Sequence, residues 1–261
     1  MRESGRALVT GATSGLGRAM AQVLLESGMQ VAIAARPTPR LAEAAARWQA
    51  QGLQAEAFAV DVRDEASVAA MARAVEDRMG GLDFAVNNAG IGMRTVNPRF
   101  FQDPRPFYEV PAAGFEDVVR TNFTGYFLVA KALCGIFLRQ GHGRLVNITM
   151  NLSTMQRRGF VPYGPARAGA EALSRIMTED LRAKGIWVNQ LLPGGATLTG
   201  MIPPGAPREG LLPAEVMGPP IAFLASPEAE GLTGARIDAS RFNEWLSAYR
   251  SGHPPESPEI F

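Results

Sequence analysis

The sequence is poor in cysteine and histidine, on which many disulfide-bonded and metal-binding proteins depend. Its 261 residues include one cysteine, Cys134, and two histidines, His142 and His253. A single cysteine excludes an internal disulfide and is compatible with a reducing compartment. Cys134 lies in the apolar run FLVAKALCGIFL, which favours a buried packing residue over a catalytic thiol. The histidines lie in a GHG turn and a proline-rich tail, so we predict neither a histidine-based triad nor a metal site.

The sequence also lacks an excess of charge of one sign and a long hydrophobic run. Lys and Arg total 26 and Asp and Glu total 25, which leaves no basic surface field for nucleic acid. The N-terminal segment MRESGRALVTG contains no apolar stretch of signal-peptide length. The most apolar run, residues 123–138, is interrupted by Lys131 and is too short to span a bilayer. We therefore expect a soluble cytoplasmic protein that binds neither nucleic acid nor membrane.

Short apolar runs alternate with longer segments of helical pattern along the whole chain. The predicted strands are Ala7–Val9, Gln30–Ala34, Gln54–Val60, Leu82–Val86, Arg144–Ile148, Ile186–Leu192 and Ala235–Asp238. The predicted helices are Gly15–Ser27, Arg40–Gln51, Glu65–Met79, Ala113–Gln140, Tyr163–Lys184 and Pro213–Ala225. The strand runs are apolar at successive positions, as in parallel strands buried on both faces. This pattern predicts an α/β fold, a doubly wound Rossmann-type parallel sheet of about seven strands with helices on both faces.

The composition does not change abruptly anywhere along the chain. We therefore expect one domain over residues 1–250 and a C-terminal tail over residues 251–261, whose Ile260 and Phe261 could dock on a neighbour. Residues 92–112 and 193–213 are long and irregular, and both follow predicted strands. Loops of this length in a compact domain are often functional, and these two should rise at the carboxyl edge of the sheet, where open α/β folds bind ligands.

A glycine-rich turn follows the first strand. The stretch ALVTGATSGLGRAM places Gly11, Gly15 and Gly17 between a strand and a helix. Glycine allows a tight turn and lets the backbone approach a pyrophosphate, while a helix N-terminus offers free N–H groups and positive potential. We therefore predict that this turn binds a dinucleotide, with Thr13, Ser14 and Leu16 beside the glycines.

The spacing TGATSGLG resembles that of the short-chain dehydrogenase/reductase family. The resemblance extends to Asp61-Val62, to NNAG at 87–90, to TNFTG at 121–125 and to PGG at 193–195. It implies that Asp61 and Val62 contact the adenine. It also implies that Asn88, Ala89 and Gly90, together with Pro193 and Gly194, border the remainder of a nicotinamide coenzyme.

The end of the second strand indicates which nicotinamide coenzyme is bound. An acidic residue there would accept hydrogen bonds from the adenosine ribose and favour NAD. This chain instead has Ala35, followed by Arg36, with Arg40 nearby. A guanidinium can bind a 2′-phosphate in a bidentate manner, so we predict NADP(H), with NAD less favoured.

The resemblance also implies a catalytic set from which this chain departs at two positions. Tyr163 matches the family's acid/base, and Asn122 matches the asparagine that supports a proton relay. Arg167, four residues after Tyr163, occupies the position of the family's lysine, and Met150, thirteen residues before Tyr163, occupies that of its serine. An arginine is permanently charged, so it can stabilise a tyrosinate and bind ribose hydroxyls, but it does not readily release a proton.

The loss of the serine hydroxyl leaves several candidates for contact with the substrate. A thioether donates no hydrogen bond, so Met150 cannot orient a carbonyl oxygen as a hydroxyl would. Asn151 could donate its amide, Ser153 offers the best remaining hydroxyl, or Met150 could line an apolar pocket. With Gly195, these are the predicted substrate contacts, and the alternatives stay open at this stage.

The two long loops contribute apolar side chains to the same region. Phe100, Phe101, Phe107 and Tyr108 lie in the first loop, and Met201 and Ile202 lie in the second. They could line a pocket for an aromatic or alicyclic carbonyl or alcohol, or simply pack the loops onto the body of the protein. Helices 113–140 and 163–184 are apolar, and the resemblance implies that they form the interface of a homodimer or homotetramer.

Three functions remain compatible with the sequence. The first is an NADP(H)-dependent enzyme that interconverts a carbonyl and an alcohol on a small, apolar or aromatic substrate. The second is a non-redox lyase or isomerase on the same scaffold. The third is a catalytically silent NADP-binding regulator. Tyr163 and Asn122 favour the first function, while Met150 and Arg167 keep the other two open.

Overall fold

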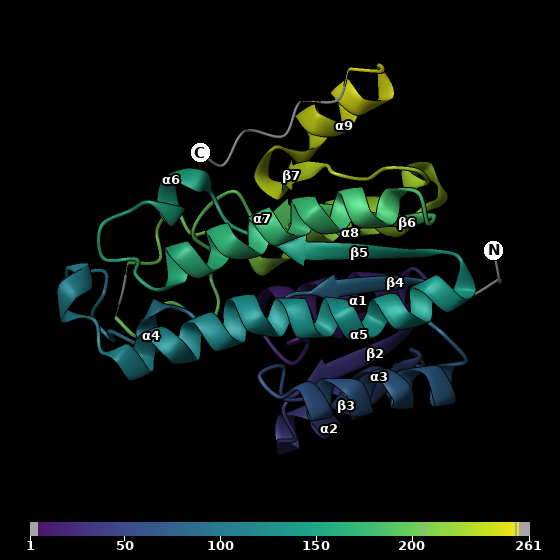
Figure 1. Cartoon of the computed structure of the whole chain (residues 1–261), viewed down its shortest axis with the longest axis horizontal. Coiled ribbons are helices and arrows are strands. Elements are labelled where there is room, and N and C mark those ends of the chain that lie inside the picture. Colours follow the sequence, from purple (N-terminus) through teal and green to yellow (C-terminus); the bar gives the residue numbers. More distant parts are fainter. Residues whose placement is uncertain (1–4, 206, 254, 256–261) are drawn as a thin grey trace.

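Seven parallel strands form one sheet in the computed structural model, which describes residues 5–205, 207–253 and 255. The strands are β1 Arg6–Thr10, β2 Gln30–Ala35, β3 Ala55–Ala59, β4 Phe84–Asn87, β5 Gly143–Ile148, β6 Ile186–Leu192 and β7 Arg236–Asp238. Their order is β3-β2-β1-β4-β5-β6-β7, so the chain starts near the middle, winds outward to β3 and then crosses to the other half (Figure 1). This order confirms the predicted doubly wound Rossmann-type sheet.

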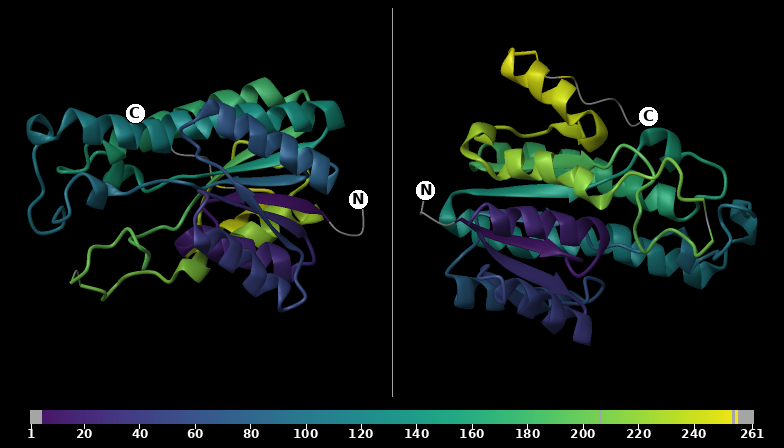
Figure 2. Two further views of the ribbon diagram at one scale, coloured as in Figure 1. Left: turned by 90° about the horizontal axis from the view of Figure 1, so that it is seen from below. Right: turned by 180° about the vertical axis from the view of Figure 1, so that it is seen from behind.

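Helices cover both faces of the sheet. They are α1 Gly15–Glu26, α2 Pro39–Gln49, α3 Glu65–Met79, α4 Ala112–Val119, α5 Gly125–Gln140, α6 Leu152–Met155, α7 Tyr163–Arg182, α8 Gly218–Ala225 and α9 Phe242–Arg250. Helices α3, α5 and α7 lie on the face nearer the viewer in Figure 1, and α1 and α8 lie on the opposite face, as the view from behind in Figure 2 shows. The fold therefore has three layers, with the sheet in the middle.

Each face of the sheet packs into its own apolar core. Val9 and Ile33 point into the core beneath α1 and α8, whereas Leu8 and Ala32 point into the core beneath α3 and α5. All four side chains are fully buried. Successive residues of a strand thus enter opposite cores, which explains why the strand runs are apolar at every position.

The expected elements agree with the observed ones to within about two residues, with four differences. The predicted helix Pro213–Ala225 begins with a 3-10 turn, Ala214–Met217, before α8 starts at Gly218. The predicted helix 113–140 is interrupted by a π-helical turn, Arg120–Thr124, between α4 and α5. Helices α6 and α9 were not predicted. Helix α9 contributes Phe242 and Trp245, whose ring centroids lie 5.8 and 5.7 Å from that of Phe223 in α8. In the expected tail 251–261, residues 254 and 256–261, including Ile260 and Phe261, lie outside the described residues.

The long helix of residues 112–140 requires one correction. The sequence predicts that the run 123–138 is too short to span a bilayer, but this run belongs to a 29-residue helical segment, Ala112–Gln140, that includes the π-helical turn and is long and apolar enough by length and composition. However, 56% of the most apolar stretch is buried inside this protein. Leu128, Val129, Leu133 and Ile136 pack against the sheet, so the apolar character is explained by the core.

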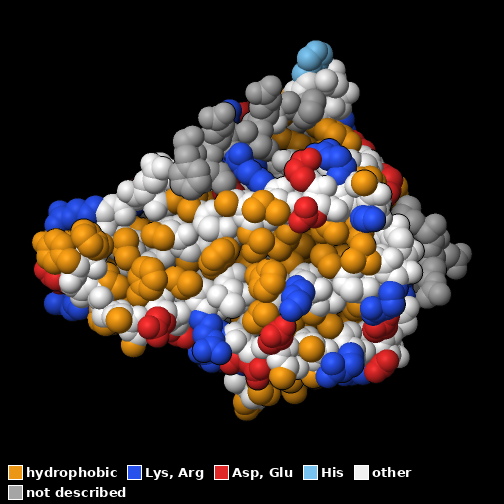
Figure 3. Space-filling model, in the orientation of Figure 1, with side chains coloured by type: hydrophobic (Ala, Val, Ile, Leu, Met, Phe, Trp, Pro, Cys, Tyr) orange, Lys and Arg blue, Asp and Glu red, His pale blue; other side chains and the backbone are white. Residues whose placement is uncertain are grey.

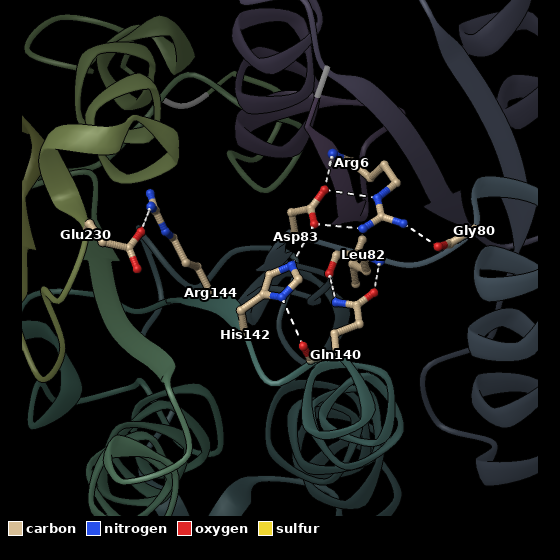
Figure 4. Close-up of polar contacts among 8 residues, drawn as sticks. All are labelled: Arg6, Gly80, Leu82, Asp83, Gln140, His142, Arg144 and Glu230. Atoms are coloured by element: carbon tan, nitrogen blue, oxygen red, sulfur yellow. Dashed lines mark hydrogen bonds and ion pairs between the residues drawn. The ribbon is translucent and has the colours of Figure 1, made fainter. Parts of the chain in front are cut away.

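The amino edge of the sheet is held by a polar network, shown in Figure 4. The Arg6 guanidinium donates to both carboxylate oxygens of Asp83, at 3.0 and 2.8 Å, and His142 contacts the same carboxylate at 3.0 Å. Gln140 donates to the carbonyl of Leu82 and accepts from its amide. Burial alone would raise the pKa of Asp83, but the hydrogen bonds from Arg6 and His142 outweigh it and lower the pKa to about 2.

The carboxyl edge carries the two long loops, which extend beyond the sheet at the left of Figure 1. The loops meet where the side chain of Met201 packs against Gly92. The second loop also returns to the glycine-rich turn, because Thr199 packs against Gly15. The residues that follow β1, β4, β5 and β6 are therefore brought together at this edge.

Candidate active site

The glycine-rich turn and the NNAG segment are tied to each other through Thr10, the last residue of β1. The Thr10 hydroxyl accepts hydrogen bonds from the amides of Asn88 and Ala89 at 2.9 and 3.0 Å. The Asn88 side chain donates to the Thr10 carbonyl at 2.8 Å. A Cβ on Gly17 would lie 2.3 Å from the Gly11 carbonyl oxygen, so only glycine allows this close packing of turn and helix.

The N-terminus of α1 is a suitable place for a phosphate. Gly11 and Gly15 have positive φ values of 69° and 51°, which fold the turn containing Thr13 and Ser14 over the end of the helix. Within the described residues the Ser14 side chain caps no helix N–H group, and the first turn, which includes Leu16, contains no acidic residue. The free N–H groups and the helix dipole therefore favour an anion here, so a pyrophosphate fits this turn.

Arginines border the outer side of the same turn. Arg36 is exposed, one residue beyond the end of β2. A groove of about 770 Å³ between α1 and α2 is lined by Thr13, Ser14, Arg18 and Arg40, and also by acidic residues such as Glu43. Ala35 therefore ends the strand where an acidic residue would be expected in an NAD site, and Arg36 follows it.

Asp61 and Val62, for which the resemblance implies contact with an adenine, follow β3. Hydrogen bonds from the Arg63 side chain, the shortest at 2.7 Å, are the main reason why the pKa of Asp61 is lowered to about 2. Arg63 also pairs with Asp117 at 2.9 Å. The Asp61 carboxylate is therefore ionised and already engaged, and Val62 is buried beside the start of α5.

Asn122 lies in the π-helical turn and holds the segment that follows NNAG. Its side chain is fully buried, accepts from the Ile91 amide and donates to the Ile91 carbonyl, each at 2.8 Å. Both functional groups of the amide are therefore occupied by the backbone. The direct role of this side chain is to fix the course of the chain past Gly90.

Tyr163 and Arg167 lie together at the start of α7. The Cζ atom of Arg167 lies 5.4 Å from the Tyr163 ring centroid, and the Arg167 side chain is almost fully buried, with a relative exposure of 3%. Burial lowers the pKa of Arg167, but its interactions with Tyr126 and Tyr163 outweigh that effect and raise the pKa above its usual value. A permanent positive charge therefore lies beside the Tyr163 phenol.

The Arg167 guanidinium is also close to the NNAG segment. A Cβ on Gly90 would lie 2.7 Å from Nη2 of Arg167 and 3.0 Å from Oδ1 of Asn122, so the backbone at Gly90 passes close to both side chains. Nη1 of Arg167 donates to the Ile148 carbonyl at 2.9 Å and to the Tyr126 hydroxyl. Nε of Arg167 is a buried donor without a partner among the described residues.

The segment after β5 contains the candidates for orienting a substrate. The Thr149 hydroxyl donates to the Glu171 carboxylate at 2.6 Å, and the Met150 carbonyl accepts from Arg236 at 2.7 Å. Asn151 donates from its amide to the Gly194 carbonyl at 3.0 Å, which places it against the PGG turn. Ser153 is exposed on α6. Of the two polar candidates, Asn151 is the one whose contact with the rest of the site is defined.

A buried ion pair lies beneath this segment. Glu171 of α7 and Arg236 of β7 approach to 2.5 Å, with side-chain exposures of 0% and 8%. Together they hold Thr149 through its hydroxyl and Met150 through its carbonyl. The pair therefore fixes the backbone at the position where a serine would be expected.

Pro193, Gly194 and Gly195 follow β6 and complete the border of the site. Each of the three is partly exposed. Gly194 accepts the Asn151 amide, and the Gly195 carbonyl accepts from the Thr197 hydroxyl at 3.1 Å. Asn151 and the PGG turn are therefore joined directly, as expected for two neighbours on one side of the site.

The aromatic residues of the first loop divide into two groups. Phe100 is buried and packs on Phe101 and Phe160, with centroid distances of 4.4 and 5.8 Å. Phe107 and Tyr108 contact each other, but they are 72% and 74% exposed. Phe100 therefore packs the loop, which is one of the two alternatives open for these side chains, whereas Phe107 and Tyr108 are largely exposed.

The comparison with known proteins agrees with this geometry. The profile of the family described as short chain dehydrogenase matches residues 6–208. The chain belongs to this family. Among its relatives, 3-oxoacyl-(acyl-carrier-protein) reductase FabG from Vibrio cholerae is 31% identical over 243 residues, covering 88% of this chain and 93% of that protein.

Two solved structures of the short-chain dehydrogenase type are also similar. A protein from Sinorhizobium meliloti described as a short-chain alcohol dehydrogenase has a TM-score of 0.79 and 32% identity, with 92% of this chain and 96% of that chain covered. A single-residue variant of actinorhodin polyketide ketoreductase, solved with NADPH, has a TM-score of 0.79 and 27% identity, with 93% and 99% covered. The chain is thus an oxidoreductase of the short-chain dehydrogenase type.

Three residues of this short-chain dehydrogenase site were not singled out from the sequence: Tyr126, Glu171 and Arg236. Tyr126 lies in the apolar run 123–138, and nothing in that run marks its hydroxyl as functional. Glu171 follows Tyr163 and Arg167 at spacings of four residues, which places all three on one face of α7. The charge of Glu171 on the same helix face as Tyr163 and Arg167 was therefore a signal in the sequence that could have identified it. Arg236 is far away in the sequence, and only the sheet brings it to Glu171.

The structure also bears on Cys134 and on metal binding. Burial raises the pKa of Cys134 to about 11, which agrees with a packing residue rather than a reactive thiol. Over residues 5–205, 207–253 and 255, no cluster of three or more His, Cys, Asp or Glu side chains suited to a metal ion is found.

Proposed function

We propose that the protein is an NADP(H)-dependent oxidoreductase that interconverts a carbonyl and an alcohol on a small, apolar or aromatic substrate. The observation that carries this proposal is the pairing of Tyr163 with the buried guanidinium of Arg167. The pair lies at the carboxyl edge of the sheet, beside Gly90 of the NNAG segment. A phenol beside a fixed cation is suited to exchanging a proton with a carbonyl oxygen.

The residues of this chain account for the proton half of the reaction. When bound, the nicotinamide coenzyme supplies the hydride for reduction or accepts it in oxidation. In reduction, Tyr163 donates its phenolic proton to the carbonyl oxygen as the carbonyl carbon receives the hydride. The Arg167 charge stabilises the phenolate that remains, and Tyr163 then regains a proton from solvent. In oxidation the same groups accept the proton of the alcohol.

The coenzyme would be held by groups that fit its parts. The pyrophosphate fits the N-terminus of α1, where the glycine-rich turn leaves N–H groups free. Nε of Arg167, which has no partner among the residues that the structure describes, and the nearby Nη2 offer donors for ribose hydroxyls beside Gly90. Arg36, supported by Arg40, is suited to a 2′-phosphate, which favours NADP(H) over NAD.

Ketone reduction is the direction that the relatives' names support. One is named a 3-oxoacyl reductase and the other a ketoreductase, and the ketoreductase was solved with NADPH. In this chain Met150 replaces the expected serine, so we assign the orientation of the substrate oxygen to the Asn151 amide. One N–H group of that amide is used by Gly194, which leaves the second for the substrate.

We further propose that the protein is cytoplasmic and forms a homodimer or homotetramer through α5 and α7. Phe127 and Leu138 of α5 and Ile176 of α7 are 43%, 49% and 59% exposed. In Figure 3 apolar side chains form a broad band over these helices. Contiguous apolar patches of this kind typically mark protein–protein interfaces.

The proposal is tested by following NADPH absorbance with a panel of aromatic, alicyclic and short aliphatic ketones. The expected result is loss of NADPH with stoichiometric formation of alcohol for at least one ketone, and slower loss of NADH at the same concentration. Rates that are higher with NADH would contradict the assignment of Arg36. No coenzyme oxidation with any carbonyl, despite NADPH binding in a fluorescence titration, would reject the oxidoreductase.

A second function, a non-redox lyase or isomerase, is favoured by one observation. The Thr149 hydroxyl is held by Glu171 and Met150 has none, so the hydroxyl expected to orient a carbonyl is absent from both positions. Turnover of a substrate without any change in nicotinamide absorbance would support this function. NADPH binding without turnover of either kind would instead indicate a catalytically silent regulator.

A further inference from the structure

Arg167 contacts a second tyrosine, Tyr126, in addition to Tyr163. Nη1 of Arg167 donates to the Tyr126 hydroxyl and to the Ile148 carbonyl. The Arg167 Cζ atom lies 5.0 Å from the Tyr126 ring centroid and 5.4 Å from that of Tyr163. One guanidinium therefore lies against two tyrosine rings, and both contacts attract a cation.

Tyr126 is itself fixed from two directions. Its hydroxyl donates to the Ile148 carbonyl at 3.1 Å, so the lone pairs of its oxygen remain available to Arg167. Its backbone carbonyl accepts from the Asn87 side chain at 2.9 Å. The side chain is buried, and burial raises the pKa of Tyr126, so the group remains a neutral phenol. Tyr126 thus offers Arg167 a rigid, uncharged acceptor.

A guanidinium needs such an acceptor more than an ammonium does. It is planar, and its donors point in fixed directions, whereas an ammonium is a compact charge on a flexible stem. With Nη1 directed to Tyr126 and Ile148, Nη2 faces the backbone at Gly90. Without this acceptor the guanidinium could rotate, which would turn Nη2 away from the backbone at Gly90.

We propose that Tyr126 is a positioning residue that makes an arginine functional at position 167, by fixing the plane of its guanidinium between Tyr163 and Gly90. Tyr126 does not contact the substrate and acts through Arg167. This inference rests on the proposed function, since it assigns Arg167 to the coenzyme and to Tyr163. It implies that positions 126 and 167 are coupled, and that a lysine at 167 needs no tyrosine at 126.

The test is a double-mutant cycle of the full chain with Tyr126→Phe, Arg167→Lys and the double variant. For each protein, kcat/KM, its pH profile, the NADPH dissociation constant and Tm are measured. Tyr126→Phe is expected to lower kcat/KM about tenfold, as for the loss of one hydrogen bond to a charged group. The alkaline limb of the profile of kcat/KM against pH should move to higher pH, because a displaced cation stabilises the Tyr163 phenolate less.

The decisive result is whether the effects of the changes at Tyr126 and Arg167 depend on each other. The double variant is expected to lie within about threefold of Arg167→Lys in kcat/KM and NADPH affinity, since the lysine no longer uses Tyr126. Tyr249→Phe is the matched control, because the Tyr249 hydroxyl also donates to a carbonyl, that of Glu228 at 3.2 Å, but distant from the site. This control should leave kcat/KM and its pH profile unchanged.

Two outcomes separate this inference from the proposed function. If the double variant shows the product of the two single effects on both kcat/KM and NADPH affinity, and the pH profile is unchanged, the two residues act independently. This result would overturn the role of Tyr126 and leave the proposed oxidoreductase function intact. If the unaltered protein reduces no carbonyl, the proposed function fails, and coupling in NADPH affinity alone then decides the role of Tyr126. If it does not bind NADPH either, both proposals are rejected.

Discussion

Asn151 and Ser153 differ in their contacts in the structure, which bears on the choice between them that the sequence leaves open. Asn151 and Ser153 were both candidates for replacing the missing serine hydroxyl. The structure joins Asn151 to the Gly194 carbonyl, whereas Ser153 lies exposed on α6. The defined contact with the PGG turn favours Asn151 as the group that meets a substrate.

Replacement of Asn151 by alanine is therefore expected to lower kcat/KM about tenfold or more, since it removes the donor that we propose for the substrate oxygen. Ser153→Ala is the matched control and should leave kcat/KM within about twofold. Steady-state kinetics on both variants with a reactive ketone provide the measurement. The reverse order of effects would transfer the role to Ser153.

At the residue scale, the sequence predicted those site residues that belong to short local motifs. Tyr163 and Arg167 are four residues apart on one helix, and Asn88 and Gly90 lie in one segment. Tyr126 was not found, because its hydroxyl gains a role only when β5 and α7 bring Ile148 and Arg167 to it. Contacts that depend on packing between distant elements leave little trace in a single sequence.

At the scale of elements, the site depends on how closely β4 and its loop pass the π-helical turn and α7. A Cβ on Gly90 would lie 2.7 Å from Nη2 of Arg167 and 3.0 Å from Oδ1 of Asn122. Both contacts are shorter than real Cβ atoms normally make, so one of the two side chains would have to move. Glycine at this position therefore allows an approach that alanine would allow only if the Arg167 or Asn122 side chain moved.

Gly90→Ala is expected to lower kcat/KM by about tenfold or more and to weaken NADPH binding, because it displaces the guanidinium from its place beside Tyr163. Gly135→Ala in α5 is the control, since the nearest atom to its new methyl group would be 3.5 Å away, at the end of the Arg139 side chain. Kinetics and an NADPH titration test the pair. Equal effects of both substitutions would contradict the account.

The elements themselves were largely predictable, because strands buried on both faces are apolar at every position. Helix α9 was missed although Phe242, Trp245 and Tyr249 follow a helical spacing. The interruption of the helix 112–140 at Arg120–Thr124 had no local signal, because Asn122 of this π-helical turn makes its side-chain hydrogen bonds to Ile91, which lies far from it in the sequence. Prediction of the π-helical turn failed because tertiary contacts decide its geometry, whereas α9 had a local signal that was overlooked.

At the scale of the whole molecule, the two edges of the sheet have different tasks. The carboxyl edge carries the proposed chemistry, while the amino edge carries the ion pair of Arg6 with Asp83 and the contact with His142 (Figure 4). The amino-edge groups tie β1 to the start of β4 and β5. They should therefore contribute to stability and leave kinetics unaffected.

Asp83→Asn is expected to lower the free energy of unfolding at pH 7 by about 2 kcal/mol, the value that corresponds to a pKa lowered from 3.8 to about 2. Because the folded-state pKa lies below the unfolded value, this stabilisation is present above about pH 4 and is lost as the pH falls toward 2. Denaturant unfolding between pH 3 and pH 7 measures the difference from the unaltered protein.

The control for this prediction is Asp103→Asn, since Asp103 and its partner Arg99 are 58% and 76% exposed. An exposed pair of this kind contributes little, so this variant should unfold like the unaltered protein. A stability difference for Asp83→Asn that stays constant between pH 3 and pH 7 would show that the carboxylate charge is not the source of the stabilisation.

The central claim is that the Tyr163 phenol delivers the proton to the substrate oxygen. It is tested most directly by measuring kcat/KM and the NADPH dissociation constant for Tyr163→Phe, which removes only the hydroxyl. We predict that kcat/KM falls at least about 100-fold, as expected for the loss of a general acid, while the NADPH dissociation constant changes by less than about threefold. A variant that reduces ketones at the rate of the unaltered protein would contradict this account.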